Sequence, residues 1–229
     1  MAEHTELLPD PLPAEPLETV ARWLADAWKA GRQPNANAMV LATATRDGRP
    51  SARVVLCKDI VPRPGYVVFY TNYDSGKGRQ LKDNPQGALV MHWDALERQV
   101  RVEGPVTLGP QKDSDRYFAS RAWQSRIGAW ASAQSQPLAS RARLLDAVKA
   151  AAGRFGTPVP GTPAAEAAAD FEIPRPPHWG GLRLWAESVE LWVAGAARVH
   201  DRARWTRTLT ATAGGAFEGG PWQVTRLQP

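Results

Sequence analysis

Apolar residues in the first part of the chain repeat first at helical and then at extended spacing. Pro16 suits the first turn of a helix, and Gly31 suits its end. Between them, one predicted apolar face consists of Leu17, Val20, Leu24 and Trp28. The preceding residues 1–15 show no regular apolar spacing, so we expect a disordered segment there and a helix from Pro16.

Short β-prone segments follow this helix and are separated by turn sequences. Strands are predicted over residues 39–45, 52–58, 66–72, 87–93 and 99–108. The sequence Arg46-Asp47-Gly48-Arg49-Pro50 is typical of a turn, so the first two strands should form a hairpin. A short helix capped by Ser75 and ended near Pro85 should follow the third strand.

The second half of the chain is predicted to pass through helices and return to strands. Helices are expected over residues 113–122 and 138–155, and strands over residues 181–193, 198–209 and 222–227. Residues 157–177 are rich in alanine and proline, which predicts a mobile loop. Many consecutive strands with few helices predict a mainly β fold, an antiparallel barrel with flanking helices, formed by one domain over residues 16–229.

Composition narrows the class of protein. The 229 residues carry a formal net charge of +5 and a single cysteine, Cys57, so no disulfide can form within the chain and a cytoplasmic location is expected. No apolar run approaches the roughly 20 residues of a membrane span. The cations do not gather in a stripe, which argues against nucleic acid, and scattered histidines predict no metal site.

The segment from Glu190 to Arg202 has the most distinctive pattern of aromatic and charged residues. In an extended chain Glu190 and Trp192 share one face, opposite three apolar residues. Continued extension would place Arg198, His200 and Arg202 on a single face as well. Cations beside an aromatic ring favour a flat, anionic ligand. The alternative is a core tryptophan beside a solvated strand edge.

Two further groups of residues suit phosphate binding. A predicted strand ends in Tyr70-Thr71-Asn72, and the sequence Ser75-Gly76-Lys77-Gly78-Arg79 then opens a helix whose N-terminus favours anions. The residues Tyr117, Arg121 and Ser125 are spaced by four, which would place the first two on one helix face and the serine just past its end. The alternatives are an ordinary capped helix and a solvated helix face.

Other candidates are single polar residues at strand ends and turns. Arg53 and Lys58 flank an apolar strand and fall on opposite faces unless the strand bends. The amides of Gln99 and Gln134 can both donate and accept hydrogen bonds, as recognition of a flavin or pyrimidine edge requires.

Taken together, these segments resemble the pyridoxine (pyridoxamine) 5′-phosphate oxidase family over roughly residues 16–229. The matching segments, in order, are RVVLCK at 53–58, FYTN at 69–72, LERQV at 96–100, RYFASR at 116–121, IGAWASAQS at 127–135, WGG at 179–181, and ELW with RVHDR at 190–202. The resemblance implies a split β-barrel that binds FMN at the interface of a homodimer.

The resemblance also implies roles for individual residues. The implied FMN contacts are Arg53, Val54, Val55, Lys58, Tyr70, Thr71, Lys77, Gln99, Gln134, Ser135, Trp192 and Arg202. The implied substrate contacts are Lys58, Tyr117, Arg121, Ser125, Arg198 and His200, of which the last two would be catalytic. The implied reaction is FMN-dependent oxidation of pyridoxamine or pyridoxine 5′-phosphate to pyridoxal 5′-phosphate, with O₂ reduced to hydrogen peroxide.

Two departures from the family pattern bear on this interpretation. Gly76 stands where the family usually has an arginine, for which Arg79 would have to compensate. Residues 1–16 contain no arginine, lysine or tyrosine, whereas the family's N-terminal arm often carries basic residues and a tyrosine. The alternatives are therefore a related FMN enzyme acting on another aromatic substrate, as in phenazine biosynthesis, and a non-catalytic flavin-binding split barrel.

Overall fold

The structure is a computed structural model that describes residues 6–229 in two compact units. Unit 1 contains the described residues up to Phe69 together with residues 83–107 and 182–229, and unit 2 contains residues 70–82 and 108–181. A single domain was expected over residues 16–229, and the structure divides these residues between the two units. Strands β4 (Tyr66–Asn72) and β7 (Trp179–Trp185) each run from one unit into the other.

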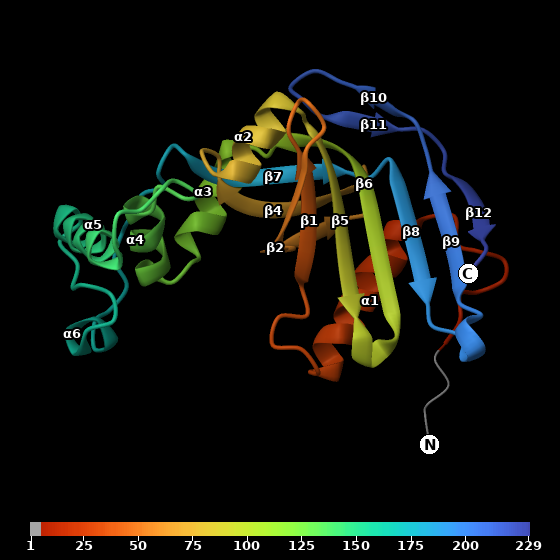
Figure 1. Ribbon diagram of the computed structural model, residues 1–229, viewed down its shortest axis with the longest axis horizontal. Coiled ribbons are helices and arrows are strands. Elements are labelled where there is room, and N and C mark those ends of the chain that lie inside the picture. The colour runs from red at the N-terminus through yellow and green to blue at the C-terminus, as the bar shows by residue number, and fades with distance from the viewer. Residues whose placement is uncertain (1–5) are drawn as a thin grey trace. The chain divides into compact units, whose positions relative to one another are not determined.

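Unit 1 is built on an antiparallel sheet, as the sequence predicted. Its main strands are β1 (Ala38–Ala44), β2 (Pro50–Leu56), β5 (Gln86–Trp93), β6 (Arg98–Leu108), β8 (Ser188–Val193), β9 (Asp201–Thr206) and β12 (Gln223–Leu227). They lie in the order β12-β9-β8-β6-β5-β1-β2, and every neighbouring pair is antiparallel (Figure 1). The short strand β3 (Asp59–Val61) pairs with β4, and β10 (Leu209–Ala211) pairs with β11 (Phe217–Gly219).

Side chains alternate across this sheet and build the core of unit 1. On β8, Val189, Leu191 and Val193 are fully buried, as the alternation predicted. Trp93 on β5 and Trp205 on β9 are buried in the same core. Burying a valine or leucine side chain contributes on the order of 1.5–3 kcal/mol. The opposite face of β8 is thereby left to Glu190 and Trp192.

Helix α1 (Pro16–Ala30) is confirmed with the predicted start and end. The Glu15 side chain caps the N-terminus, and Gly31 ends the helix with φ of 61°, in the left-handed region that glycine favours. The predicted apolar face is wrong at Trp28, whose exposed fraction is 50%. The buried face instead continues through Trp23 and Ala27, and Trp28 is turned away from it by one residue, about 100° around the helix axis.

Residues 6–15 pack along unit 1, which differs from the disorder expected for residues 1–15. Leu8 is buried, and its backbone N–H donates to Asp201 Oδ2 at 2.9 Å. Farther along, Trp205 Nε1 donates to the Pro13 carbonyl oxygen at 2.8 Å. These contacts join residues 6–15 to strand β9, which begins at Asp201. Residues 1–5 lie outside the described residues.

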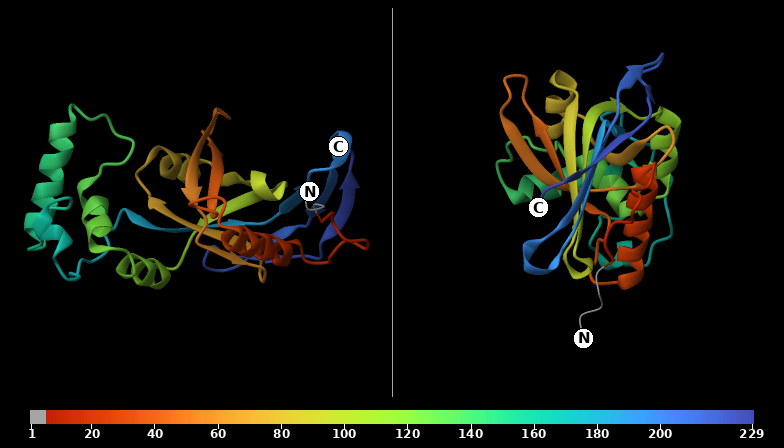
Figure 2. Two further views of the ribbon diagram at one scale, coloured as in Figure 1. Left: turned by 90° about the horizontal axis from the view of Figure 1, so that it is seen from below. Right: turned by 90° about the vertical axis from the view of Figure 1, so that its right-hand side faces the viewer.

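Unit 2 is largely helical. Its helices are α2 (Gly76–Asp83, whose last residue is assigned to unit 1), α3 (Gln111–Ala119), α4 (Trp123–Ala131), α5 (Arg141–Arg154) and α6 (Pro163–Glu166). Helices α4 and α5 lie side by side (Figure 2). Residues 157–177, for which a mobile loop was expected, contain the short helix α6 and place Ile173 in the helical core. In the same stretch, the Phe171 ring contacts Trp123 edge-on at 5.0 Å between centroids.

Several element boundaries differ from the predictions. The sequence did not predict α4, and the strand expected over residues 181–193 is two strands, β7 and β8. The strand expected over residues 198–209 begins only at Asp201, after the short 3₁₀ helix η2 (Ala196–Arg198). Another such turn, η1 (Asp94–Leu96), joins β5 to β6. Over residues 6–229, no helix is both long and apolar enough to cross a membrane.

Candidate functional site

A buried lysine forms the centre of a polar cluster in unit 2. Lys77 Nζ donates to Thr71 Oγ1 at 2.9 Å, to Ser75 Oγ at 3.2 Å and to Gln134 Oε1 at 2.9 Å. These three partners are neutral oxygens that orient the ammonium group. The structure therefore brings together three predicted site residues, Thr71, Lys77 and Gln134, in an arrangement suited to an anion.

The turn between β4 and α2 holds this cluster in place. Asn72 Oδ1 accepts a hydrogen bond from the Asp74 N–H at 2.8 Å, and Ser75 Oγ donates to the Asn72 carbonyl oxygen at 2.7 Å. Such local bonds favour a turn over continuation of the strand. Gly78 is needed here because a Cβ atom at this position would lie 2.0 Å from the Tyr73 carbonyl oxygen.

Gly76 stands where the family usually has an arginine, and Arg79 would have to compensate for it. The two residues have different surroundings. A Cβ atom at Gly76 would lie 3.8 Å from the Ser135 side chain, so Gly76 is next to a predicted cofactor residue. Ser135 itself is exposed, with φ of 68°. Arg79 is exposed, and its guanidinium donates to the Asp74 carbonyl oxygen. This bond joins Arg79 to the backbone of the turn and does not support a role for Arg79 in place of the family's arginine.

Three parallel aromatic rings form a second cluster in unit 2. Tyr70 stacks on Tyr117 at 4.0 Å and on Trp179 at 5.4 Å between centroids. The Arg121 guanidinium lies over the Trp179 ring at 4.9 Å. Its Nη1 atom is buried and has no hydrogen-bond partner among the described residues. Burial lowers the pKa of Arg121. A buried donor without an acceptor is costly, so this atom favours an anionic ligand.

The helix predicted to carry Tyr117 and Arg121 on one face is shorter than expected. Helix α3 ends at Ala119, and Ala122 adopts an extended conformation before α4 begins. Arg121 therefore lies in the connection, and Ser125 lies in the first turn of α4 and is exposed. Tyr117 and Arg121 are nevertheless close, because both contact Trp179.

Unit 1 aligns three predicted cofactor residues across neighbouring strands. Gln99 on β6 is directly opposite Trp192 on β8, and Trp192 is directly opposite Arg202 on β9. Residues that are directly opposite in antiparallel strands share one face of the sheet. The sequence predicted the face of Trp192 but could not predict this alignment, which depends on strand partners distant in the chain.

The predictions placed Glu190 on the face of Trp192 but assigned it no role in the site. Its side chain is 4% exposed and accepts hydrogen bonds from Arg101, Arg202 and Arg204. Burial alone would raise the pKa of Glu190, but hydrogen bonds from Arg202 and Arg204 and nearby positive charge hold the pKa below its usual value. The only signal in the sequence was a lone acid among arginine-rich strands.

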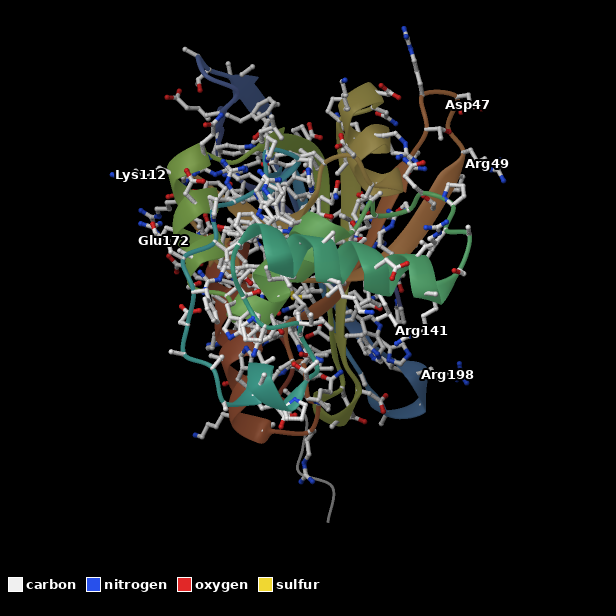
Figure 3. All side chains as sticks on the ribbon, turned by 90° about the vertical axis from the view of Figure 1, so that its left-hand side faces the viewer. Asp47, Arg49, Lys112, Arg141, Glu172 and Arg198 are labelled. Atoms are coloured by element: carbon white, nitrogen blue, oxygen red, sulfur yellow. The ribbon has the colours of Figure 1, made fainter. Side chains whose placement is uncertain are left out.

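The predicted catalytic residues lie in a tight loop after β8. Arg198 has φ of 64° and follows Ala197 with φ of 53°, so two successive non-glycine residues adopt the left-handed conformation. The predicted single face of Arg198, His200 and Arg202 is wrong, because Arg198 lies in η2 and the strand starts at Asp201. The Arg198 side chain is exposed and extends outward from the loop (Figure 3).

His200 is held by both the loop backbone and the sheet. Its Nδ1 atom accepts a hydrogen bond from the Gly195 N–H at 3.2 Å, and its ring lies 4.7 Å from Trp192 between centroids. With Nδ1 as acceptor, the neutral ring carries its proton on Nε2. Gly195 permits this turn, since a Cβ atom there would lie 1.8 Å from the Val199 carbonyl oxygen.

The β2 segment places its two predicted cations differently. The Arg53 guanidinium donates to Thr43 Oγ1 and to Ser51 Oγ, both at 2.6 Å, and burial lowers its pKa. Lys58 lies beyond the end of β2 and is exposed. The remaining predicted contacts of this segment are Val54, which is 65% exposed, and Val55, which is half-buried.

Unit 1 also contains a cavity of about 800 Å³ that is separate from these clusters. Its lining includes Trp205, Arg207 and Trp222 and none of the predicted site residues.

Comparisons with known proteins establish the family. The model of the family described as "Pyridoxamine 5′-phosphate oxidase" matches residues 24–154. A second model, "Pyridoxine 5′-phosphate oxidase C-terminal dimerisation region", matches residues 179–229. The chain belongs to the pyridoxamine 5′-phosphate oxidase family. Family membership supports FMN as the cofactor, and the dimerisation region supports a homodimer; both agree with expectation.

Similar curated proteins cover almost the whole chain. A pyridoxine/pyridoxamine 5′-phosphate oxidase of Maricaulis maris is 48% identical over 216 residues, which is 94% of this chain and 86% of the relative. The protein of the same name from Gluconobacter oxydans is 44% identical over 219 residues, 95% of this chain and 96% of the relative. This level of similarity over most of both chains agrees with the predicted resemblance.

Solved structures support the split-barrel fold. The crystal structure of PhzG from Burkholderia lata 383, in complex with tetrahydrophenazine-1-carboxylic acid, has a TM-score of 0.78 and 30% identity and covers 98% of both chains. A pyridoxamine 5′-phosphate oxidase-related, FMN-binding protein from Nostoc punctiforme has a TM-score of 0.60 and 18% identity, covering 93% of this chain and 96% of that one.

Proposed function

We propose that this protein is an FMN-dependent oxidase that converts pyridoxine 5′-phosphate, or pyridoxamine 5′-phosphate with uptake of water and release of ammonia, to pyridoxal 5′-phosphate and reduces O₂ to hydrogen peroxide. The curated relatives at 44–48% identity are named for these two substrates, which supports the proposal. The observation that carries it is Arg121, a half-buried arginine beside three stacked aromatic rings, whose buried Nη1 atom has no hydrogen-bond partner among the described residues. A phosphorylated aromatic ring would supply both an acceptor and a flat surface.

The donors in unit 2 fit the proposed phosphates. Lys77, with Thr71, Ser75 and Gln134, would hold the FMN phosphate, and Arg121 with Tyr117 would hold the substrate phosphate. Both groups contain a cationic hydrogen-bond donor, as charge-assisted phosphate binding requires. Ser125 and Lys58 are exposed and remain proposed substrate contacts from the family resemblance.

The residues of unit 1 would act on the rings of cofactor and substrate. Gln99, Trp192 and Arg202 share one sheet face and would contact FMN. The chemistry that bound FMN supplies is acceptance of a hydride from the substrate C4′ carbon, followed by reoxidation by O₂. Arg198 would orient the substrate and assist removal of the proton from the hydroxyl or amino group on C4′, and His200 would support this orientation through a hydrogen bond from Nε2. Most of the rate would come from orientation at close range.

A steady-state assay tests the proposed substrates. Purified protein with FMN should produce hydrogen peroxide and pyridoxal 5′-phosphate in equal amounts from pyridoxamine 5′-phosphate or pyridoxine 5′-phosphate. Unphosphorylated pyridoxamine is the control, and it should be used far less well because Arg121 then has no phosphate to bind. Absence of both products despite bound flavin would overturn the proposal.

A second candidate is an FMN enzyme acting on a phenazine-type acid. The observation favouring it is the structural similarity to PhzG, whose crystal structure contains tetrahydrophenazine-1-carboxylic acid. A carboxylate could also bind Arg121, so the guanidinium alone does not separate the two candidates. Competition between this acid and pyridoxamine 5′-phosphate in the same assay separates them, since the preferred substrate will have the larger kcat/KM.

A further inference from the structure

The Glu190 carboxylate joins three arginines on the sheet face that carries Gln99 and Trp192. Glu190 lies directly opposite Arg101 on β6 and Arg204 on β9. Its Oε2 atom accepts from Arg101 Nη1 at 3.4 Å and from Arg204 Nη2 at 3.2 Å. One carboxylate therefore lies among three guanidinium groups and offsets only part of their charge.

Arg202 is bound to the same carboxylate by a diagonal contact. Glu190 Oε1 accepts from Arg202 Nη2 at 2.7 Å and from Arg202 Nε at 3.3 Å, which fixes one edge of the guanidinium. Arg202 Nη1 donates to the Gln228 carbonyl oxygen at 2.9 Å. Three of the five N–H donors of the arginine are engaged in this way, and among residues 6–229 no hydrogen bond uses the other two, which would be available to a ligand.

Glu190 and Glu103 share this face but differ in burial. The Glu190 side chain is 4% exposed, whereas that of Glu103, which contacts Arg101, is 43% exposed. A charge pair screened from water is stronger and more rigid than an exposed pair. Of these two acids, Glu190 contacts Arg202 and Glu103 contacts Arg101. Replacing each glutamate by glutamine therefore gives a matched comparison.

We infer that Glu190 is a positioning residue for the cofactor: it fixes the Arg202 guanidinium so that the remaining N–H donors are preorganised for FMN. The inference deepens the proposed function and depends on it, because Arg202 is a proposed FMN contact. Without the carboxylate, Arg202 would lose its edge-on bond and be repelled by Arg101 and Arg204. FMN binding would then have to order a mobile side chain, which lowers affinity.

Titration of apoprotein with FMN, followed by quenching of flavin fluorescence, measures this effect without turnover. Glu190→Gln should raise the Kd for FMN at least tenfold. The control Glu103→Gln removes the same charge from the same face and should change the Kd less than twofold. Glu190→Asp keeps the charge but shortens the side chain, and should weaken FMN binding by a smaller factor than Glu190→Gln.

A double-mutant cycle separates positioning from a general loss of structure. If Glu190 acts through Arg202, Glu190→Gln should have little further effect on the Kd once Arg202→Met is present. Thermal midpoints of all variants show whether the fold is kept. If Glu190→Gln does not fold, the cycle is run with Glu190→Asp, which retains the counter-charge.

Three results would overturn the inference: unchanged FMN affinity in Glu190→Gln, wild-type affinity in Arg202→Met, or additive effects of the two substitutions. A wild-type protein that binds no FMN would instead contradict the proposed function. The two failures are therefore distinguishable.

Discussion

At the scale of single residues, the cations of this protein differ in what surrounds them. Arg121 is half-buried against aromatic rings, and its Nη1 atom has no partner among the described residues, whereas Arg202 shares the Glu190 carboxylate with two other arginines. Arg198 is exposed on a loop with left-handed backbone. These surroundings agree with three separate proposed tasks: phosphate binding, cofactor contact and action on the substrate ring.

Arg121→Met keeps much of the side-chain volume and removes the charge. We expect KM for pyridoxamine 5′-phosphate to rise about 10- to 100-fold, because a hydrogen bond to a charged group contributes roughly 1.5–3 kcal/mol. Arg116→Met is the control, since the Arg116 side chain is 77% exposed and pairs with Asp113 on the surface of α3. An unchanged KM in Arg121→Met, measured in the peroxide assay, would exclude Arg121 as the phosphate ligand.

Arg198→Ala should separate catalysis from cofactor binding. We expect kcat to fall at least about 100-fold, as is typical of lost proton-transfer catalysis, while FMN remains bound. Arg49→Ala in the turn between β1 and β2 is the control, because Arg49 is also exposed (Figure 3). Turnover within a few-fold of wild type, with flavin absorbance unchanged, would show that the proposed role of Arg198 is wrong.

The lowered pKa of Glu190 predicts a pH-dependent contribution to stability. A carboxyl group whose pKa is lower in the folded than in the unfolded state stabilises the fold above its usual pKa, near 4.5, and this contribution is lost as the pH falls through the folded value. The difference in unfolding free energy between wild type and Glu190→Gln should therefore shrink below about pH 4.5. Urea denaturation at fixed protein concentration measures it, and a difference that grows on acidification would contradict the pKa direction.

At the scale of elements, the sequence predicted regular strands better than the connections between them. The alternation of Val189, Leu191 and Val193 identified β8 and its buried face, because the pattern is local. Residues 123–131 form α4, which was not predicted, because its core contacts come from distant residues such as Ile173. The predicted shared face of Arg198, His200 and Arg202 was wrong for a different reason. The left-handed turn at Ala197 and Arg198 interrupts a sequence pattern that otherwise resembles a strand.

The candidate site was predictable to a similar extent. Local motifs identified Thr71, Lys77 and Arg121, all of which have the expected polar or aromatic neighbours nearby. Glu190 was placed on the Trp192 face, but its bonds to the arginines were not predicted, because they depend on which strands flank β8, and strand order depends on contacts far apart in the chain.

The turn that precedes α2 offers a test at this scale. Gly78→Ala would place a methyl group against the Tyr73 carbonyl oxygen and so displace the backbone that carries Lys77. We expect the Kd for FMN to rise at least tenfold and the thermal midpoint to fall. Gly128→Ala in α4 is the matched control, since nothing lies within 4 Å of its added Cβ and alanine favours a helix by about 1 kcal/mol. Equal FMN affinity in both variants would show that this turn does not position Lys77.

At the scale of the whole molecule, the two units hold different parts of the proposed chemistry. Unit 2 contains the Lys77 and Arg121 clusters, and unit 1 contains the Trp192 face and the Arg198 loop. The dimerisation region matched at residues 179–229 includes Trp192, Arg202 and the Arg198 loop. Family membership, the homodimer and FMN are supported, and the identity of the ring that reacts is the proposal that remains to be measured.

The measurement that tests this proposal most directly is an anaerobic titration of the FMN-loaded protein with pyridoxamine 5′-phosphate, followed by flavin absorbance. We predict that the oxidised flavin bands bleach with one equivalent of substrate per flavin, and that admission of O₂ restores them with release of hydrogen peroxide and pyridoxal 5′-phosphate. A bound flavin that stays oxidised with both pyridoxamine and pyridoxine 5′-phosphate would contradict the account.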